Sequence, residues 1–421
     1  MQTVAGIDFG TTNSSLGVLE DGKSRAVNIC NFGSDEKTLR SALFIDEEHE
    51  IFVGQQAIKE YVDSGGYYGR FMQSLKAFLP SQSLSEARVY GRRYTIEHLV
   101  SLLLSEIKRL GEESTNQPLD DVVLGRPVFF SENEENDRLA QKRLEDAARR
   151  SGFKSIQFEL EPVAATLAYL ESLPKGTEQT ILMSDFGGGT SDFTVMNLRA
   201  GADLSFEQKR ERVLAIDGVY IGGDTFDGRL MWEKITPNFG RYVKYKSMTG
   251  QTLDMPSNIV RTLCEWHKLP FARTRETQRN LREIRMTADH PEQIENLEYI
   301  IWENKGFAIF QAIEQAKKSL SSELESTIQF RDRQLNISEH VTRSEFEEML
   351  SEDIGAITAC VKRCLQTAKL NADGIDKVLL TGGSSYIPAI RDIFETGFGS
   401  EKVIVLDAFT SVAQGLALSV R

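Results

Sequence analysis

Two short stretches of the sequence each place an aspartate ahead of a glycine-rich turn that carries hydroxyl groups. Asp8 precedes Gly10-Thr11-Thr12-Asn13, and Asp185 precedes Gly187-Gly188-Gly189-Thr190. Glycine allows successive backbone N–H groups to point at an anion, and threonine and asparagine add side-chain donors. An aspartate repels phosphate, but it can hold Mg²⁺, usually through water, and the metal then bridges to the phosphates. These residue types therefore suit the binding of phosphate groups together with magnesium.

The competing interpretation is that each turn is only a structural β-turn. Neither turn has the G-x-x-x-x-G-K-[ST] form, and neither opens a predicted helix. Taken alone, the first turn favours this structural interpretation. The second half of the chain, however, repeats the same order of apolar strand, aspartate, glycine-rich turn and strand. This repetition favours a phosphate clamp, and it predicts two similar lobes that contribute one hairpin each.

Two more features extend this candidate site. Asp192 follows the second turn and could join Asp8 and Asp185 around a metal ion. A third glycine pair, Gly382-Gly383, lies between a predicted strand and a predicted helix. The N-terminus of a helix carries unpaired N–H groups, so this helix could face a phosphate or a nucleoside.

The first half of the chain reads as alternating strands and helices that would position these turns. A turn signal at Asp21-Gly22 predicts an opening antiparallel hairpin. Apolar spacing predicts a helix over 96–110 that stops at Gly111, and a charged helix over 134–150. Residues 122–130 between them read as a buried strand broken by Pro127.

The second half predicts a hairpin over 180–198 and then a strongly charged segment, 236–300, read as a peripheral and mostly helical insertion. A long helix is expected from Trp302. Thr342 and Glu345 form a plausible capping box for a further helix that reaches past Leu365. A strand and a small-residue helix close the chain.

Composition limits the classes of function. The chain has 421 residues and a formal net charge of −13, which argues against a large nucleic-acid interface because such an interface needs a basic face. No apolar run approaches the roughly 18 residues that span a bilayer, and the N-terminus lacks the features of a signal peptide. We therefore expect a cytoplasmic protein with no nucleic-acid or membrane partner.

Four cysteines are too few and too scattered for a disulfide framework. Cys360 and Cys364 are four residues apart in a predicted helix and could share a metal. No second Cys or His pair lies nearby in the sequence, so ordinary helix packing is the favoured interpretation.

Six stretches together resemble the ATPase domain of the 70-kDa heat-shock chaperone family. They are GIDFGTTNS (6–14), LEPVAATLAY (160–169), DFGGGTSDF (185–193), IGGDTFDGRL (221–230), AIEQAKKSLSS (312–322) and LTGGSSYIPAI (380–390). The stretches occur in the family's order along nearly the whole chain, except 236–300 and part of 33–95. That family belongs to the superfamily of actin and the sugar kinases.

The resemblance implies an α/β, bilobal, actin-like ATPase fold, in which two ribonuclease-H-like lobes enclose a nucleotide cleft. Lobe I would comprise 1–176 and the returning segment 404–421, with a smaller subdomain at about 33–115. Lobe II would comprise 177–403, including the divergent insertion at about 236–300. The implied cofactors are ATP or ADP and Mg²⁺.

The resemblance also implies roles at the phosphates. The two turns would clamp the β- and γ-phosphates from opposite lobes, with Asp8, Asp185 and Asp192 around the metal through water. The catalytic set would be Lys76, Glu161, Asp185 and Thr190. Without the resemblance, Glu161 is an acid favoured by the N-terminus of a helix and Lys76 is a solvated surface lysine.

The nucleoside side is implied in the same way. The α-phosphate, ribose and adenine contacts would come from Gly222, Gly223, Glu314, Lys317, Lys318, Ser321, Gly382, Gly383, Ser384 and Tyr386. Without the resemblance, the charged residues of the EQAKK stretch are a solvated helix face. The family usually has arginines on both sides of the adenine, where this sequence has Lys318 and Tyr386. Tyr386 could stack through its ring.

The function implied is that of an ATP-binding, slowly ATP-hydrolysing, chaperone-like protein whose lobes close under control of the nucleotide. Its partner would be a protein client or a co-chaperone. The family's peptide-binding domain is not recognised in the sequence, so the chaperone role is implied by relationship alone. The alternatives are a small-molecule kinase of the same superfamily, which needs an acceptor pocket, and an actin-like filament former.

Overall fold

The computed structural model describes residues 3–20, 22–30, 37–64, 69–83, 86–131, 133–202, 204–247, 249–264, 269, 272–303, 305–407 and 410–419. The chain divides into two compact units. Unit 1 comprises Met1–Tyr61, Gly69–Gly222 and Ala356–Arg421, and unit 2 comprises Val62–Tyr68 and Gly223–Gly355. The boundaries of the two predicted lobes stay a prediction.

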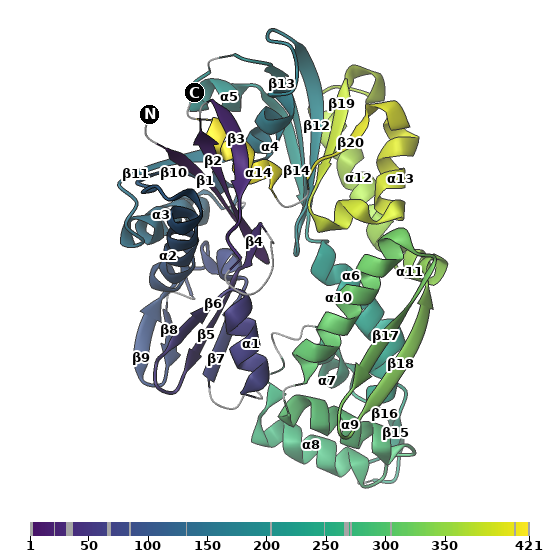
Figure 1. The fold of residues 1–421 in the computed structure, drawn as a ribbon. Coiled ribbons are helices and arrows are strands. Elements are labelled where there is room, and N and C mark those ends of the chain that lie inside the picture. The colour runs from purple at the N-terminus through teal and green to yellow at the C-terminus, as the bar shows by residue number, and fades with distance from the viewer. Residues whose placement is uncertain are drawn as a thin grey trace. The chain divides into compact units, whose positions relative to one another are not determined.

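Unit 1 contains two sheets with equivalent strand orders (Figure 1). The first sheet has the order β11-β10-β1-β2-β3, with β4 also paired to β2, and the second has the order β14-β13-β12-β19-β20. In each sheet three successive strands form an antiparallel meander, and two later strands run parallel to its first strand. The repeated sequence pattern therefore corresponds to two equivalent hairpins, β1–β2 and β12–β13.

The strands of the first sheet are β1 (Val4–Phe9), β2 (Asn13–Glu20), β3 (Lys23–Val27), β4 (Thr38–Arg40), β10 (Asp121–Arg126) and β11 (Ser155–Leu160). Those of the second sheet are β12 (Glu178–Phe186), β13 (Ser191–Arg199), β14 (Val213–Val219), β19 (Lys377–Thr381) and β20 (Val403–Val405). The predicted opening hairpin is β2–β3; Asp21 at its turn lies outside the described residues.

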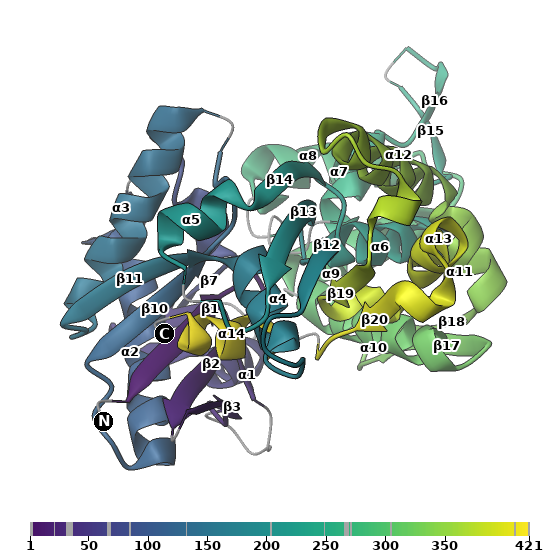
Figure 2. The same ribbon diagram turned by 90° about the horizontal axis from the view of Figure 1, so that it is seen from above.

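A short helix rich in small residues, α14 (Ser411–Leu418), packs on the first sheet and on α4 (Glu161–Leu170), as Figures 1 and 2 show. Glycines allow the close approach. A Cβ atom on Gly6 of β1 or on Gly17 of β2 would collide with the backbone of α14, and one on Gly415 would collide with the carbonyl oxygen of Ala164 in α4. The close approach of the first sheet and of α4 thus requires small side chains on α14.

Two helices, α2 (Ile96–Thr115) and α3 (Glu134–Arg150), share a hydrophobic core with the first sheet. The prediction that the first of them ends at Gly111 is wrong, because α2 continues through that residue. Gly111 is buried, and a Cβ atom there would collide with the side chain of Leu16. The glycine serves close packing rather than termination.

The remaining described elements of unit 1 are smaller. A three-stranded sheet has the order β6-β5-β7, and β8 pairs with β9. Their bounds are β5 (Ala42–Asp46), β6 (Ile51–Val53), β7 (Gly69–Gln73), β8 (Glu86–Val89) and β9 (Arg92–Thr95). The helices are α1 (Gln55–Asp63), which extends into unit 2, α5 (Phe206–Glu211), α12 (Ser351–Thr367), which begins in unit 2, and α13 (Pro388–Phe398). Cys360 and Cys364 are buried on α12, in agreement with the packing interpretation.

Unit 2 contains α6 (Gly223–Leu230), α7 (Ser257–Arg261), α8 (Arg275–Arg285), α9 (Pro291–Trp302), α10 (Gly306–Ser322) and α11 (Arg343–Met349). Its strands form two hairpins, β15–β16 (Lys244–Lys246 and Thr252–Asp254) and β17–β18 (Glu325–Arg331 and Asn336–Thr342).

Three expectations for this part of the chain need correction. The predicted long helix does not begin at Trp302, which ends α9; it begins at Gly306. The segment 236–300 is helical in part but also contains the β15–β16 hairpin, and it has fully buried residues such as Leu281 and Leu297. The capping box at Thr342 is confirmed, but the helix that it opens is α11, and a separate helix, α12, carries the chain past Leu365.

Candidate functional site

The clearest chemical feature of unit 1 is a buried ion pair between Lys76 and Glu161. The Lys76 Nζ atom lies 2.7 Å from Glu161 Oε1, and the side chains are only 12% and 10% exposed. Glu161 is the first residue of α4, directly after β11, so its place is fixed by a strand end and a helix start. Lys76 lies in a short 3-10 turn, Leu75–Phe78, that follows β7. The structure thus brings together two predicted catalytic residues that are distant in sequence.

Gly125 near the end of β10 makes room for Glu161, and the sequence analysis missed it. A Cβ atom on Gly125 would lie 3.0 Å from Glu161 Cγ and 3.3 Å from its Oε1 atom. A larger residue at this position would require the Glu161 side chain to shift by a few tenths of an ångström. The available signal was a glycine inside an otherwise apolar strand, which often marks a close approach.

Asp8 and Asp185 lie in the same electrostatic neighbourhood, at the ends of β1 and β12. Burial, followed by the charge of Glu161, raises the pKa of Asp8 to about 7, whereas Lys76 opposes the shift. Burial also raises the pKa of Asp185 to about 8, and Glu161, Asp192 and Asp8 add to the effect in that order. Burial alone would lower the pKa of Lys76, but Glu161 and Asp8 outweigh it and raise the pKa. The charges of these four groups therefore interact with one another as one cluster.

Such a cluster concentrates negative charge and suits a cation. Asp192 lies directly opposite Asp185 in the β12–β13 register and has an exposed side chain. Within the described ranges no three His, Cys, Asp or Glu side chains are grouped closely enough to hold a metal directly. Carboxylate oxygens at strand ends are nevertheless the ligand type that Mg²⁺ takes through its water shell, so the donor set fits the predicted ion.

The two glycine-rich turns are held by different partners. In the second turn the Gly187 N–H donates to Thr190 O at 2.9 Å, and Thr190 Oγ1 donates to Asp192 Oδ2 at 2.9 Å. In the first turn Ser41 donates its N–H to Thr12 O at 2.9 Å and its hydroxyl to Gly10 O at 2.7 Å. Ser41 has no motif of its own, and the sequence analysis missed it.

Two further glycines lie against the second hairpin. A Cβ atom on Gly222 would come within 2.6 Å of Gly188 O, and one on Gly382 would collide with the backbone of Phe186. Gly382 also has φ of 84°, a conformation that disfavours other residues. The predicted phosphate-facing glycines of three separate segments therefore meet in unit 1.

The expectation that Gly382-Gly383 opens a helix needs correction. The glycines lead into a 3-10 turn, Gly383–Tyr386, and α13 begins only at Pro388. In this turn Ser384 is buried and Tyr386 is 47% exposed. The available ligand-facing groups here are those of the turn, and no helix N-terminus directly follows the glycines.

The predicted nucleoside residues of α10 lie in unit 2 and differ in exposure. Lys317 donates to Asp227 Oδ2 at 2.7 Å and to Gly223 O at 3.1 Å, and its side chain is only 14% exposed. Lys318 is 59% exposed and pairs with Glu314 at 3.0 Å. Lys317 is thus held by α6, through Asp227, a residue that the sequence analysis missed. Ser321 donates to Lys317 O at 3.4 Å within the helix.

The buried Asp227 makes a pH-dependent prediction. Burial, opposed by Lys317 and reinforced by Glu314 and Asp224, raises its pKa from 3.8 to about 6. The folded protein then holds this proton more tightly than the unfolded chain, so this group's contribution to stability falls as pH rises from about 4 to about 6.

We expect the change in melting temperature between pH 4 and pH 6.5 to differ measurably between the wild type and Asp227→Asn. The loss of stability that the titration of Asp227 causes as the pH rises should be absent from the variant. Glu352→Gln, which alters an 86% exposed side chain, should keep the wild-type profile. Identical profiles for wild type and Asp227→Asn would show that Asp227 does not titrate in this window.

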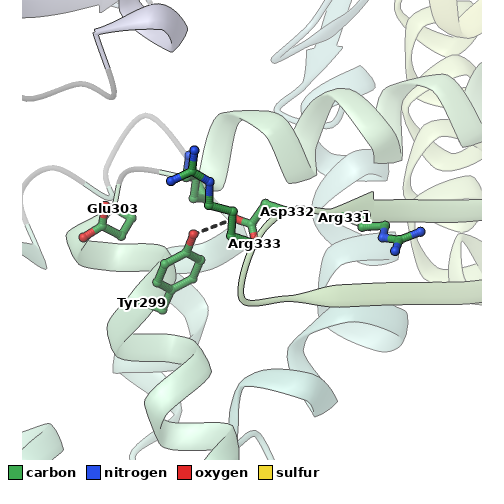
Figure 3. Close-up of a pocket in the computed structure, with 6 residues that line it drawn as sticks. Tyr299, Glu303, Arg331, Asp332 and Arg333 are labelled. Carbon is green, nitrogen blue, oxygen red and sulfur yellow. Dashed lines mark hydrogen bonds between the residues drawn. The ribbon is translucent and has the colours of Figure 1, made fainter.

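A separate polar cavity of about 620 Å³ lies in unit 2 (Figure 3). It is lined by Tyr299, Glu303, Lys305, Arg331, Asp332 and Arg333. The Tyr299 hydroxyl donates to Asp332 Oδ2 at 2.7 Å, and burial followed by this hydrogen bond raises the pKa of Tyr299 to about 12. The same carboxylate accepts two backbone N–H groups of the β17–β18 turn. None of the predicted site residues lines this cavity.

The paired sheets with their equivalent hairpins define an actin-like ATPase fold of the α/β class. A family model described as "Hsp70 protein" matches residues 72–298 and 306–420. The chain therefore belongs to the Hsp70 family, and at family level it is an ATP-binding, chaperone-related ATPase. No helix in the described part of the chain combines the length and apolar character that crossing a membrane requires.

Proposed function

We propose that this protein binds ATP with Mg²⁺ and hydrolyses it slowly, as a nucleotide-controlled, chaperone-like switch. The main support for the proposal is one observation: the buried Lys76–Glu161 pair interacts electrostatically with Asp8 and Asp185 in one cluster. A lysine and a carboxylate beside a carboxylate cluster provide positive charge for a phosphoryl group and an acceptor for a water proton.

Each residue of the cluster would have a distinct role. Asp8, Asp185 and Asp192 would hold Mg²⁺ through water, and the ion would neutralise charge on the phosphates. Lys76 would offset charge that develops on the γ-phosphoryl group. Glu161, aided by Asp185 and Thr190, would orient the attacking water or accept its proton. Catalysis of this kind depends on positioning and electrostatics.

The backbone N–H groups of the two glycine-rich turns would bind the phosphates. Gly10-Thr11-Thr12-Asn13 and Gly187-Gly188-Gly189-Thr190 supply these groups, and their tight turn geometry supports the assignment. The proposal also includes the nucleoside contacts predicted on α10, at Gly222-Gly223 and in the turn 382–386. It further includes closure of the lobes under control of the nucleotide, a protein client or co-chaperone as partner, and a cytoplasmic location.

Calorimetry with ATP and with ADP, in the presence and absence of Mg²⁺, followed by a phosphate-release assay, tests the proposal. We expect Mg²⁺-dependent binding of both nucleotides and slow phosphate release without an added acceptor. ADP formation that requires an added sugar or carboxylic acid, with the phosphoryl group then found on that acceptor, would instead identify a small-molecule kinase. Tight binding with no release would identify a nucleotide sensor.

The side chain of Tyr386 makes a separate prediction. If its ring stacks on adenine, Tyr386→Ala should weaken ATP binding by about 1 kcal/mol, the scale of an aromatic stacking contact. Tyr242→Ala, which removes a 65% exposed ring in unit 2, is the matched control and should leave affinity unchanged. Unaltered affinity in the Tyr386 variant would show that the nucleoside is held by other residues.

A further inference from the structure

The turn that carries Lys76 has little regular structure to fix it. It opens at Ser74, whose φ of 58° is unfavourable for a residue with a side chain. Three backbone hydrogen bonds follow, from Ala77 N to Ser74 O, from Leu79 N to Lys76 O and from Ser81 N to Phe78 O. The carbonyl groups at the end of such a short turn can also accept hydrogen bonds from neighbouring segments.

Arg143, on the neighbouring helix α3, donates hydrogen bonds to these carbonyl groups. Its Nη1 group donates to Leu79 O at 2.9 Å and to Ser81 O at 2.8 Å, with Phe78 O at the longer distance of 3.5 Å. Its Nε atom lies 3.0 Å from Oε1 of Glu97, in the first turn of α2. The arginine is only 7% exposed. It therefore joins the end of the Lys76 turn to two helices.

The burial of this guanidinium is informative because burying a charge is costly unless it is paired and hydrogen-bonded. Glu97 supplies the charge and the turn supplies the acceptors. Packing between α3 and the core is provided by apolar residues of the same helix, such as Ala140, Leu144 and Ala147, which are fully buried. The guanidinium group of Arg143 is therefore directed at the turn and at Glu97, whereas apolar residues pack α3 against the core.

We propose that Arg143 is a positioning residue that fixes the turn 75–81 and thereby places Lys76 Nζ for phosphoryl transfer. Leu75 and Leu79 anchor the turn in the core, and Arg143 sets the direction in which the chain leaves it. A displacement of about 1 Å at a catalytic group can reduce the rate by about 100-fold. The effect on catalysis rests on the proposed role of Lys76, whereas the effect on the turn does not.

The test combines two readouts on the full chain. Hydrogen–deuterium exchange of the peptide that covers 75–83 reports on the turn, and single-turnover ATP hydrolysis with a separate measurement of ATP affinity reports on catalysis. The variants are Arg143→Met, which keeps the apolar stem, Arg143→Lys, Lys76→Ala and the double variant Lys76→Ala/Arg143→Met. Arg138→Ala, which changes a 76% exposed arginine of the same helix, is the control.

We expect Arg143→Met to speed exchange at 75–83 and to lower the hydrolysis rate by roughly 10- to 100-fold, with ATP affinity unchanged. Arg143→Lys should restore part of both, because a lysine still donates to the carbonyls but lacks the fork geometry. In the Lys76→Ala background, Arg143→Met should cause no further loss of rate. Arg138→Ala should match the wild type in every measurement.

Unchanged exchange in Arg143→Met would overturn the positioning of the turn, whatever the rates. An equal loss of rate with and without Lys76 would overturn the claim that Arg143 acts through Lys76. A wild-type rate in Lys76→Ala would instead overturn the proposed function of the lysine, and the exchange data would still decide on the turn. If Arg143→Met does not fold, Glu97→Gln replaces it and should give smaller changes in the same directions.

Discussion

Lys76→Ala should lower the rate constant for ATP hydrolysis by about 10²- to 10³-fold, the scale of losing one well-placed electrostatic group in an active site. The ε-ammonium group is buried against Glu161, so its charge acts where water does not screen it. Under the proposed role, Lys76 acts mainly on the transition state, so nucleotide affinity should hold. Single-turnover kinetics and calorimetry on the same protein measure the two quantities.

Lys108→Ala is the matched control for this prediction. Lys108 is also in unit 1, is 13% exposed and pairs with a carboxylate. Its described partners are Glu112, Leu119 and Phe153, none of which is a predicted site residue. Asp8→Asn should instead weaken Mg²⁺-dependent nucleotide binding, because Asp8 is proposed to hold the metal through water. A Lys76→Ala variant with wild-type turnover, or one that loses affinity and rate equally, would contradict the role given to this lysine.

Gly415→Ala should destabilise the fold by at least about 1–3 kcal/mol, the usual cost of adding atoms to a well-packed core. The new methyl group would be directed at the carbonyl oxygen of Ala164, a backbone atom that cannot rotate away. Relief of the clash requires α14 to move away from α4 and the first sheet. Chemical denaturation of the wild type and the variant gives the free energy of unfolding directly.

Gly397→Ala provides the matched control. Gly397 lies in the helix α13, and a Cβ atom there would meet no atom within 4 Å. The same substitution should stabilise the protein by about 0.5–1 kcal/mol at this position, because alanine favours helix. Equal effects at the two glycines would show that the α14–α4 contact is not as close as described.

The sequence predicts best those features whose physical cause is local. The glycine turns follow apolar strands and precede apolar strands, so the β1–β2 and β12–β13 hairpins could be anticipated. The capping box of Thr342 and Glu345 depends on residues three positions apart and is present as predicted. The repetition of the aspartate–glycine pattern also anticipates the matching strand orders of the two sheets.

Features that depend on contacts between distant segments could not be predicted in this way. Ser41, Gly125 and Asp227 each act on a residue at least 31 positions away. Gly111 has the sequence signature of a helix end, but contact with Leu16 makes it a packing residue. The β17–β18 hairpin was missed although its strands alternate buried and exposed residues, because its turn lacks the glycine that usually marks one.

Under the proposed function, the Lys76–Glu161 cluster promotes transfer of the γ-phosphoryl group of ATP to water. Hydrolysis of Mg²⁺·ATP in ¹⁸O-labelled water, with no added acceptor and with mass spectrometry of the released phosphate, tests this directly. We expect each phosphate to carry one solvent oxygen, and the labelled product to fall by about 10²- to 10³-fold in Lys76→Ala. Labelled phosphate that forms at the same rate in the Lys76→Ala variant would contradict this proposal. ADP that forms only with an added acceptor, which then carries an unlabelled phosphoryl group, would also contradict it.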